Sequence, residues 1–330
     1  MSALRHAARR ARALSLWEEL DTMWLEFLMV AAGLVILILA GDALVKGAVN
    51  LALRLGIPAL VVSLTVVAFG TSAPELLVSV QAMLGGVPGL ALGNVVGSNT
   101  ANVLLVLGIP ALFAVMRTSA CDVRRDYLAM MGASLLFFAL CLTGTLRWWH
   151  GLILLAALAV TLVVTFRTTR GEEVEVEGVE PGLPGGRLAL YLILGLVGLP
   201  LGANLLVSGA TEIARTFGVS ETAIGLTLVA IGTSLPELAT TVMAALRRHA
   251  DVALGNVIGS NLFNLLAIMG IAVLFGPVPI DGTFLTIDLP VMIGASLLLV
   301  PVVFFGRDIT RVWGVVLSAL YVVYLVVALS

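Results

Sequence analysis

The chain has 330 residues, of which 60% are hydrophobic and only 12% are charged. Soluble domains carry about a quarter of charged residues, so the composition predicts an integral membrane protein surrounded by the lipid bilayer. The net charge is −2, and no basic stripe with interleaved aromatic residues occurs in the sequence. Nucleic acid is therefore not expected as a partner.

Apolar runs as long as a bilayer is thick predict ten transmembrane helices in an all-α fold. In chain order they cover residues 25–49, 58–84, 90–116, 127–145, 149–167, 188–213, 221–246, 251–275, 286–305 and 309–329. Residues 1–24 precede them as an N-terminal tail. Three interpretations of this tail stay open: Met23 is the true start, residues 1–20 form an interfacial helix, or a signal peptide with its apolar core at 27–40 is cleaved. Cleavage would leave an odd number of helices.

The distribution of positive charge predicts how the helices are oriented. Most Lys and Arg residues lie in, or next to, the loops after the first, third, fifth, seventh and ninth helices. Positive loops stay in the cytoplasm, so both termini are expected outside the cell inner (plasma) membrane. The acidic stretch 168–187 is then a cytoplasmic linker. The tail disagrees with this rule, because its four arginines would lie outside.

Two motifs occur twice at one fixed offset. "AFGTSAPEL" at 68–76 returns as "AIGTSLPEL" at 230–238, and "GNVVGSNTAN" at 93–102 returns as "GNVIGSNLFN" at 255–264, each 162 residues later. The offset covers five predicted helices, an odd number, so the second half should enter the membrane from the opposite side. The sequence thus predicts two inverted-topology five-helix repeats, residues 25–167 and 188–330, an architecture typical of secondary transporters.

The first motif places a proline and a glutamate at membrane depth. Pro74 cannot donate a hydrogen bond to the carbonyl of Gly70, so a backbone oxygen becomes free at the depth of Glu75. The second copy repeats the arrangement with Pro236 and Glu237. Carboxylates inside a membrane are costly, and they usually mark an ion or substrate pathway.

Further oxygen ligands lie on the same helices and on their partner helices. Residues four apart share a helix face, which groups Thr71 with Glu75 and Thr233 with Glu237. The other candidates are Ser72 and Ser234 in the first motif, and Asn94, Ser98, Asn102, Asn256, Ser260 and Asn264 in the second.

All these candidate ligands are oxygen atoms, with no thiolate or imidazole among them. Hard cations prefer such a set, and Ca²⁺ accepts six to eight oxygen ligands in flexible geometry. Two carboxylates neutralise one Ca²⁺, and the same cage can hold Na⁺ instead. The sequence therefore predicts Ca²⁺ and Na⁺ as transported ions, and no cofactor.

Other polar residues are interpreted as structural. Asp42 and Lys46, four residues apart near the end of the first predicted helix, should form a local ion pair. Glu212 should lie at the membrane interface. Cys121 and Cys141 are about one membrane thickness apart by this topology, so a disulfide between them is not expected.

At these motifs the sequence resembles the cation/Ca²⁺ exchanger superfamily, specifically its prokaryotic Na⁺/Ca²⁺ exchanger branch. The residues that carry the resemblance are "GTSAPE" with "GNVVGSNTAN" and "GTSLPE" with "GNVIGSNLFN". It implies four ion sites between the second, third, seventh and eighth helices, and sliding of the first and sixth helices to alternate access. By motif position the implied ion ligands are Glu75, Glu237, Thr71, Ser72, Thr233, Ser234, Ser98, Asn102 and Ser260, with backbone carbonyls near Ala68 and Ala230.

One position departs from the family pattern. Several relatives carry Asp where this chain has Asn264, so the cage has two carboxylates rather than three. The departure puts K⁺ co-transport in doubt, together with any proton held at Asn264.

We expect an electrogenic Na⁺/Ca²⁺ antiporter that functions as a monomer and is not an enzyme. H⁺/Ca²⁺ exchange, K⁺-dependent exchange and a divalent-cation channel are the alternatives.

Overall fold

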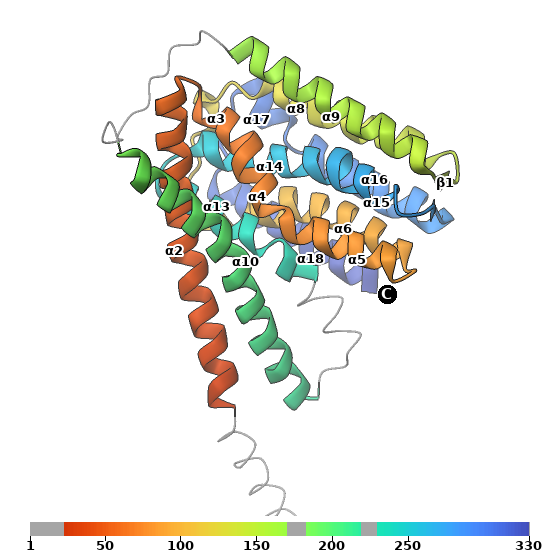
Figure 1. The fold of residues 1–330 in the computed structure, drawn as a ribbon, viewed down its shortest axis with the longest axis horizontal. Coiled ribbons are helices and arrows are strands. Elements are labelled where there is room, and N and C mark those ends of the chain that lie inside the picture. Colours follow the sequence, from red (N-terminus) through yellow and green to blue (C-terminus); the bar gives the residue numbers. More distant parts are fainter. Residues whose placement is uncertain (1–22, 170–182, 219–229, 330) are drawn as a thin grey trace, which may run out of the picture.

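A computed structural model describes residues 23–169, 183–218 and 230–329 (Figure 1). Residues 1–22 of the predicted tail, most of the predicted acidic linker and the first part of the predicted span 221–246 lie outside these residues. Within them the fold is helical, apart from two short strands that pair with each other. The all-α prediction is therefore confirmed for the described part of the chain.

Two long helices form a pair at one edge of the molecule. They are α2 (Trp24–Leu55) and α10 (Gly185–Thr216), each of 32 residues, and they lie side by side over much of their length (Figure 1). Glycines allow this close approach. A Cβ on Gly33 would lie 2.6 Å from the backbone nitrogen of Leu206, and one on Gly195 would lie 2.5 Å from the Cβ of Leu44.

The rest of the first half consists of shorter helices, several of them interrupted. After α2 come α3 (Ala59–Val62), the π-helix η1 (Ser63–Val67), α4 (Ala68–Thr71) and α5 (Ala73–Leu84). They are followed by α6 (Pro88–Ala101), the π-helix η2 (Asn102–Val106), α7 (Gly108–Phe113), the 3₁₀ turn η3 (Thr118–Ala120), α8 (Arg124–Cys141), β1 (Thr145–Leu146) and α9 (Trp148–Thr169).

The second half repeats much of this order after α10. Its described elements are α12 (Ala230–Thr233), α13 (Leu235–Leu246), α14 (Ala250–Leu262), the π-helix η5 (Phe263–Ile268), α15 (Met269–Ala272), β2 (Val278–Pro279), the π-helix η6 (Phe284–Asp288), α16 (Leu289–Leu297), α17 (Val300–Phe305) and α18 (Arg311–Leu329). Both ends of α13 lie 162 residues after those of α5, and α14 begins 162 residues after α6. The repeated motifs therefore fold into repeated elements.

The helices differ in how deeply they are buried. The continuous run Ala250–Ala272 is entirely buried in its apolar window, and Pro88–Phe113 is 78% buried, whereas α9 and α10 are only 22% buried. The outer helices expose Leu, Val and Phe side chains, such as Leu194 and Val160. This pattern fits an integral membrane protein whose centre is formed by α6 and α14 and whose periphery contacts lipid.

Among the described residues, six helical runs are long and apolar enough to cross a membrane, or seven if the bent pair Ala59–Thr71 and Ala73–Leu84 is one span. The shorter apolar helices Leu235–Leu246 and Arg311–Val327 fall below that length. The predicted span 221–246 begins within residues 219–229, which the structure does not describe. The number ten therefore stays a prediction.

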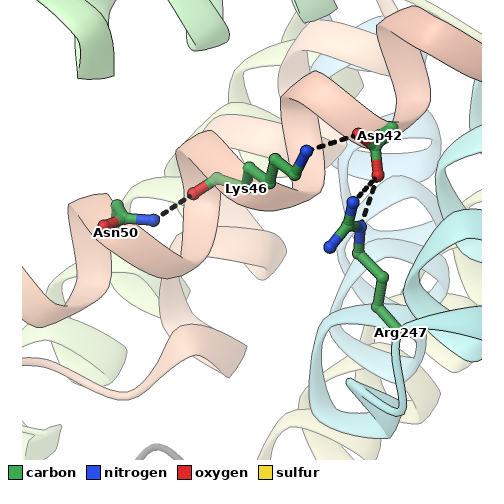
Figure 2. Close-up of polar contacts among 4 residues, drawn as sticks. All are labelled: Asp42, Lys46, Asn50 and Arg247. Carbon is green, nitrogen blue, oxygen red and sulfur yellow. Dashed lines mark hydrogen bonds and ion pairs between the residues drawn. The ribbon is translucent and has the colours of Figure 1, made fainter. Parts of the chain in front are cut away.

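Ionic contacts tie α2 to the end of α13. The predicted Asp42–Lys46 pair is present, with 2.9 Å between Lys46 Nζ and Asp42 Oδ2 (Figure 2). The other carboxylate oxygen of Asp42 accepts from the guanidinium of Arg247, directly after α13. Asn50 Nδ2 donates to the Lys46 carbonyl at 2.9 Å, and Lys46 Nζ lies 5.9 Å from the ring centroid of Tyr191 in α10. This cluster connects three helices.

Candidate ion-binding site

Two helices are broken at equivalent places, next to the prolines. Ser72 separates α4 from α5 with φ −83° and ψ 7°, and Ser234 separates α12 from α13 with φ −86° and ψ 4°. The first break bends the chain by 43°. Pro74 and Pro236 then stand in the first turn of the new helix, where the missing N–H is tolerated. The predicted interruptions are thus found, with nearly identical backbone geometry.

The two glutamates lie in the first turns of these new helices, in the interior of the protein. Glu75 is 1% exposed and Glu237 is 0% exposed. The unpaired N–H groups at a helix N-terminus give that end a positive potential, which favours a carboxylate. Because α5 and α13 begin at the breaks, each break both turns the chain and stabilises its glutamate.

Glu237 accepts hydrogen bonds from both halves of the chain. Ser72 Oγ donates to its Oε1 at 2.9 Å, and Ser260 Oγ donates to the same atom at 3.5 Å. Its Oε2 has no hydrogen-bond partner, and neither has Oε2 of Glu75. Since Ser72 lies three residues before Glu75 and bonds to Glu237, both carboxyl groups belong to the same buried region, where two negative charges are unfavourable together. A cation between them would remove this repulsion.

Two asparagines, Asn94 and Asn256, form equivalent hydrogen bonds to the helices that carry the glutamates. Asn94 Nδ2 donates to the Glu75 carbonyl at 3.1 Å and to Ser79 Oγ at 2.9 Å. Its counterpart, Asn256, donates from Nδ2 to the Glu237 carbonyl at 3.3 Å and to Thr241 Oγ1 at 3.1 Å. The matching bonds hold α6 against α5 and α14 against α13. They assign these two asparagines a structural task.

Three more of the predicted ligands carry buried polar atoms without partners. Asn102 begins η2, and its Oδ1 is unpartnered, as are both amide atoms of Asn264 in η5 and the hydroxyl of Ser234. A buried polar group without a hydrogen bond costs about 1–3 kcal/mol. The oxygens among these atoms, together with the free oxygens of Glu75 and Glu237, are ones that a cation would satisfy, whereas the NH₂ of Asn264 needs an acceptor. We call these five side chains, which are candidate cation ligands, the ion site.

The other predicted ligands surround this set in different ways. Thr71 Oγ1 contacts Asn256 Oδ1 at 3.3 Å, Ser98 is buried on α6 one turn before Asn102, and Thr233 is the last residue of α12. The Ala68 carbonyl accepts from the Ser72 N–H at 3.0 Å and from Thr71 Oγ1 at 3.3 Å. The Thr71 hydroxyl has a single hydrogen, so when it donates to Asn256 Oδ1 the Ala68 carbonyl accepts only from the Ser72 N–H and keeps one lone pair for a cation. Ala230 begins α12.

One pair of buried asparagines, Asn99 and Asn261, was not predicted from the sequence. Asn99 Nδ2 donates to the Asn261 carbonyl at 3.3 Å, and Asn261 Nδ2 donates to the Asn99 carbonyl at 3.4 Å. The two residues are 162 positions apart, so the bonds are reciprocal between equivalent residues of the two halves. Their presence in both copies of the second motif was the available signal.

The donor set favours hard cations. The ion site offers carboxylate, amide and hydroxyl oxygens, and nowhere in the described residues do three or more His, Cys, Asp or Glu side chains gather as a metal cluster. Alkali and alkaline-earth cations bind such oxygens, whereas zinc and copper prefer imidazole and thiolate. A buried site of oxygen ligands that includes two carboxylates and lies at interrupted membrane helices is typical of a cation transporter.

Comparison with known proteins identifies the family. The family model described as "Sodium/calcium exchanger protein" matches residues 25–167 and 187–330, and the chain belongs to this family. It is 37% identical to the putative antiporter CaxA of Alkalimonas amylolytica, over 90% of this chain and 96% of that protein. It is 35% identical to the sodium/calcium exchanger MaX1 of Methanosarcina acetivorans, over 91% and 97%.

A solved structure has the same fold. The sodium-calcium exchanger NCX_Mj, soaked without Na⁺ and Ca²⁺, superposes with a TM-score of 0.81 at 31% identity, covering 93% of this chain and 99% of that chain. The family consists of transporters rather than enzymes. The protein is thus a membrane antiporter of the sodium/calcium exchanger family, as the motifs predict.

Proposed function

We propose that this protein exchanges Ca²⁺ for Na⁺ across the membrane by electrogenic, secondary active antiport. The observation that carries the proposal is the pair Glu75 and Glu237, which are buried in repeat-related helix breaks, each with a carboxylate oxygen free of partners. The name of MaX1, a sodium/calcium exchanger, supports the choice of ions.

The ion site explains why transport is coupled. An empty site leaves two carboxylates facing each other in a low-dielectric interior, which is unfavourable. A bound Ca²⁺ neutralises both charges. Na⁺ ions in the same oxygens also remove the repulsion, and electrogenic exchange requires at least three of them for each Ca²⁺, one more than the two carboxylates balance. The barrier between the states open to the outside and to the inside is then low only when ions occupy the site. Ca²⁺ that leaves on one side must therefore be replaced by Na⁺ before the protein returns.

The proposal includes a specific architecture. Ten helices form two inverted five-helix repeats, residues 25–167 and 188–330, with the ion site near the membrane midplane where the halves meet. The recurrence of α5, α6, α13 and α14 at one offset supports this arrangement. The protein acts as a monomer in the cell inner (plasma) membrane, with both termini outside and residues 168–187 in the cytoplasm.

The test is ⁴⁵Ca²⁺ uptake into proteoliposomes loaded with Na⁺ and diluted into Na⁺-free medium. Vesicles loaded with K⁺, or with an acidic lumen, serve as controls. We expect uptake only with an outward Na⁺ gradient, at an initial rate that changes with an imposed membrane potential. Uptake driven by the acidic lumen would establish H⁺/Ca²⁺ exchange instead. A requirement for K⁺ together with Na⁺ would establish K⁺-dependent exchange, and equal uptake under all loadings would identify a channel.

A further inference from the structure

We propose that Asn261 is a positioning residue that turns the amide of Asn102 so that its oxygen faces the transported cation. The inference rests on the proposed function, since it assigns the oxygen of Asn102 to the ion site. The key contact is between side chains: Asn102 Nδ2 donates to Asn261 Oδ1 at 3.0 Å. Both residues are 1% exposed, so water does not compete for this bond.

The contact decides which end of the Asn102 amide is available. An asparagine side chain has a donating NH₂ at one end and an accepting oxygen at the other. Asn261 uses the NH₂, and Asn102 Oδ1 is left buried and without a partner. Rotation of the amide by half a turn would present the NH₂ to a cation, which would repel it.

The orientation of Asn261 is fixed in turn by α6 and α8. Its Nδ2 donates to the Asn99 carbonyl at 3.4 Å and contacts Met130 Sδ at 3.7 Å. Only its Oδ1 remains to receive Asn102. A chain of oriented amides therefore runs from the Asn99 backbone through Asn261 to the free oxygen of Asn102.

The repeat provides a natural comparison in which this bond is missing. Asn99 is equivalent to Asn261, and Asn264 is equivalent to Asn102, each at the offset of 162. Asn99 makes the same backbone contact, donating to the Asn261 carbonyl at 3.3 Å. Its Oδ1, however, has no partner, and neither amide atom of Asn264 has one. The orienting bond is thus made in one half and not in the other.

This difference yields a matched pair of variants, Asn261→Ala and Asn99→Ala. Each removes one of the two reciprocal backbone contacts and leaves a void of the same size, but only Asn261→Ala releases Asn102. We expect Asn261→Ala to weaken Ca²⁺ binding about tenfold, the effect of one hydrogen bond, and Asn99→Ala to weaken it less than about threefold. Binding is measured with ⁴⁵Ca²⁺ on purified protein in detergent, without any Na⁺ gradient.

A double-mutant cycle separates orientation from general structure. In Asn102→Asp both ends of the side chain accept, and the oxygen that replaces Nδ2 would face Asn261 Oδ1, another acceptor. Asn261→Ala then removes a repulsion instead of an orienting bond, so adding it to Asn102→Asp should leave Ca²⁺ binding unchanged or strengthen it. Equal weakening by Asn261→Ala and Asn99→Ala, or a full tenfold weakening by Asn261→Ala in the Asn102→Asp background, would overturn the proposal.

Two provisions keep the test decisive. If Asn261→Ala does not fold, Asn261→Ser replaces it, because its shorter side chain fills part of the void and still ends short of the Asn102 amide. A failure of the proposed function can be distinguished from a failure of this inference. If wild-type protein binds Ca²⁺ but shows no Na⁺-driven uptake, the proposed coupling is refuted, and the double-mutant cycle can still be interpreted. Wild-type protein that does not bind Ca²⁺ overturns both proposals.

Discussion

Replacing Glu237 by Gln removes one charge from the ion site and almost nothing else. The amide has the shape of the carboxylate, and its oxygen can still accept from Ser72 and Ser260. Its NH₂ would stand where Oε2 of Glu237 is now buried without a partner. Removing one member of a buried charge pair costs about 3–5 kcal/mol, so we expect Ca²⁺ to bind about 150- to 5,000-fold more weakly.

Stability should change in the opposite sense. Glu237 is fully buried, and the neutral amide does not carry the desolvation cost of a carboxylate. We therefore expect the melting temperature of Glu237→Gln without Ca²⁺ to equal or exceed that of the wild type. The assay is ⁴⁵Ca²⁺ uptake into Na⁺-loaded proteoliposomes, combined with melting in detergent with and without Ca²⁺. Glu75→Gln should behave in the same way.

Glu212→Gln is the matched control, because Glu212 is an exposed carboxylate that pairs with Arg215 on its own helix at 2.5 Å. Uptake and Ca²⁺ stabilisation should both be unchanged in this variant. The assignment of the ion site is refuted if Glu237→Gln half-saturates with Ca²⁺ within threefold of the wild type. It is also refuted if Glu212→Gln loses as much affinity as Glu237→Gln.

Three further predictions concern stability and reactivity. Asp42→Asn should lower the melting temperature by about 2–4 °C, the effect of about 1 kcal/mol, because Lys46 and Arg247 lose their shared carboxylate. Glu212→Gln should lower the melting temperature less, and equal shifts in the two variants would contradict the prediction. Gly33→Ala should destabilise by about 1–3 kcal/mol in denaturant titrations, since its Cβ would overlap α10, whereas Gly132→Ala, with open space around it, should not. Burial raises the pKa of the Cys121 thiol from 9.0 to about 12, so the reactive thiolate forms only as the pH rises towards that value. The rate of iodoacetamide labelling of Cys121 should therefore increase about tenfold per pH unit between pH 8 and 10. A labelling rate that levels off near pH 9 would disprove the shift.

The breaks at Ser72 and Ser234 could be predicted because their cause is local. A proline affects the hydrogen bonds of its own turn, and that effect is readable from neighbouring residues. The glutamates could be predicted for a similar reason, since a carboxylate in an apolar run requires a counter-charge wherever the fold places it. Repetition at one offset strengthened both predictions without any knowledge of packing.

Contacts between distant helices could not be predicted. Asp42 was expected to pair with Lys46, one turn away, but nothing in the sequence indicates that Arg247, 205 residues later, would share its carboxylate. Asn99 and Asn261 were overlooked because their task depends on α6 meeting α14. Helix ends were also displaced: the first span was predicted to end at residue 49, yet α2 continues to Leu55. Hydropathy measures the apolar length of a helix, whereas backbone hydrogen bonding decides its end.

The ion cluster around Asp42 breaks the duplication of the fold. At an offset of 162, Asp42 corresponds to Asn204 and Arg247 to Gly85, so the equivalent contact in the other half has no charges. A perfectly duplicated protein would give its two facing states equal energies. In the proposed alternating-access cycle, a movement that separated Asp42 from Arg247 would break this ion pair without forming an equivalent pair in the other half. The ion pair at this helix crossing would therefore make one of the two access states more stable than the other, and the protein at rest would favour that state.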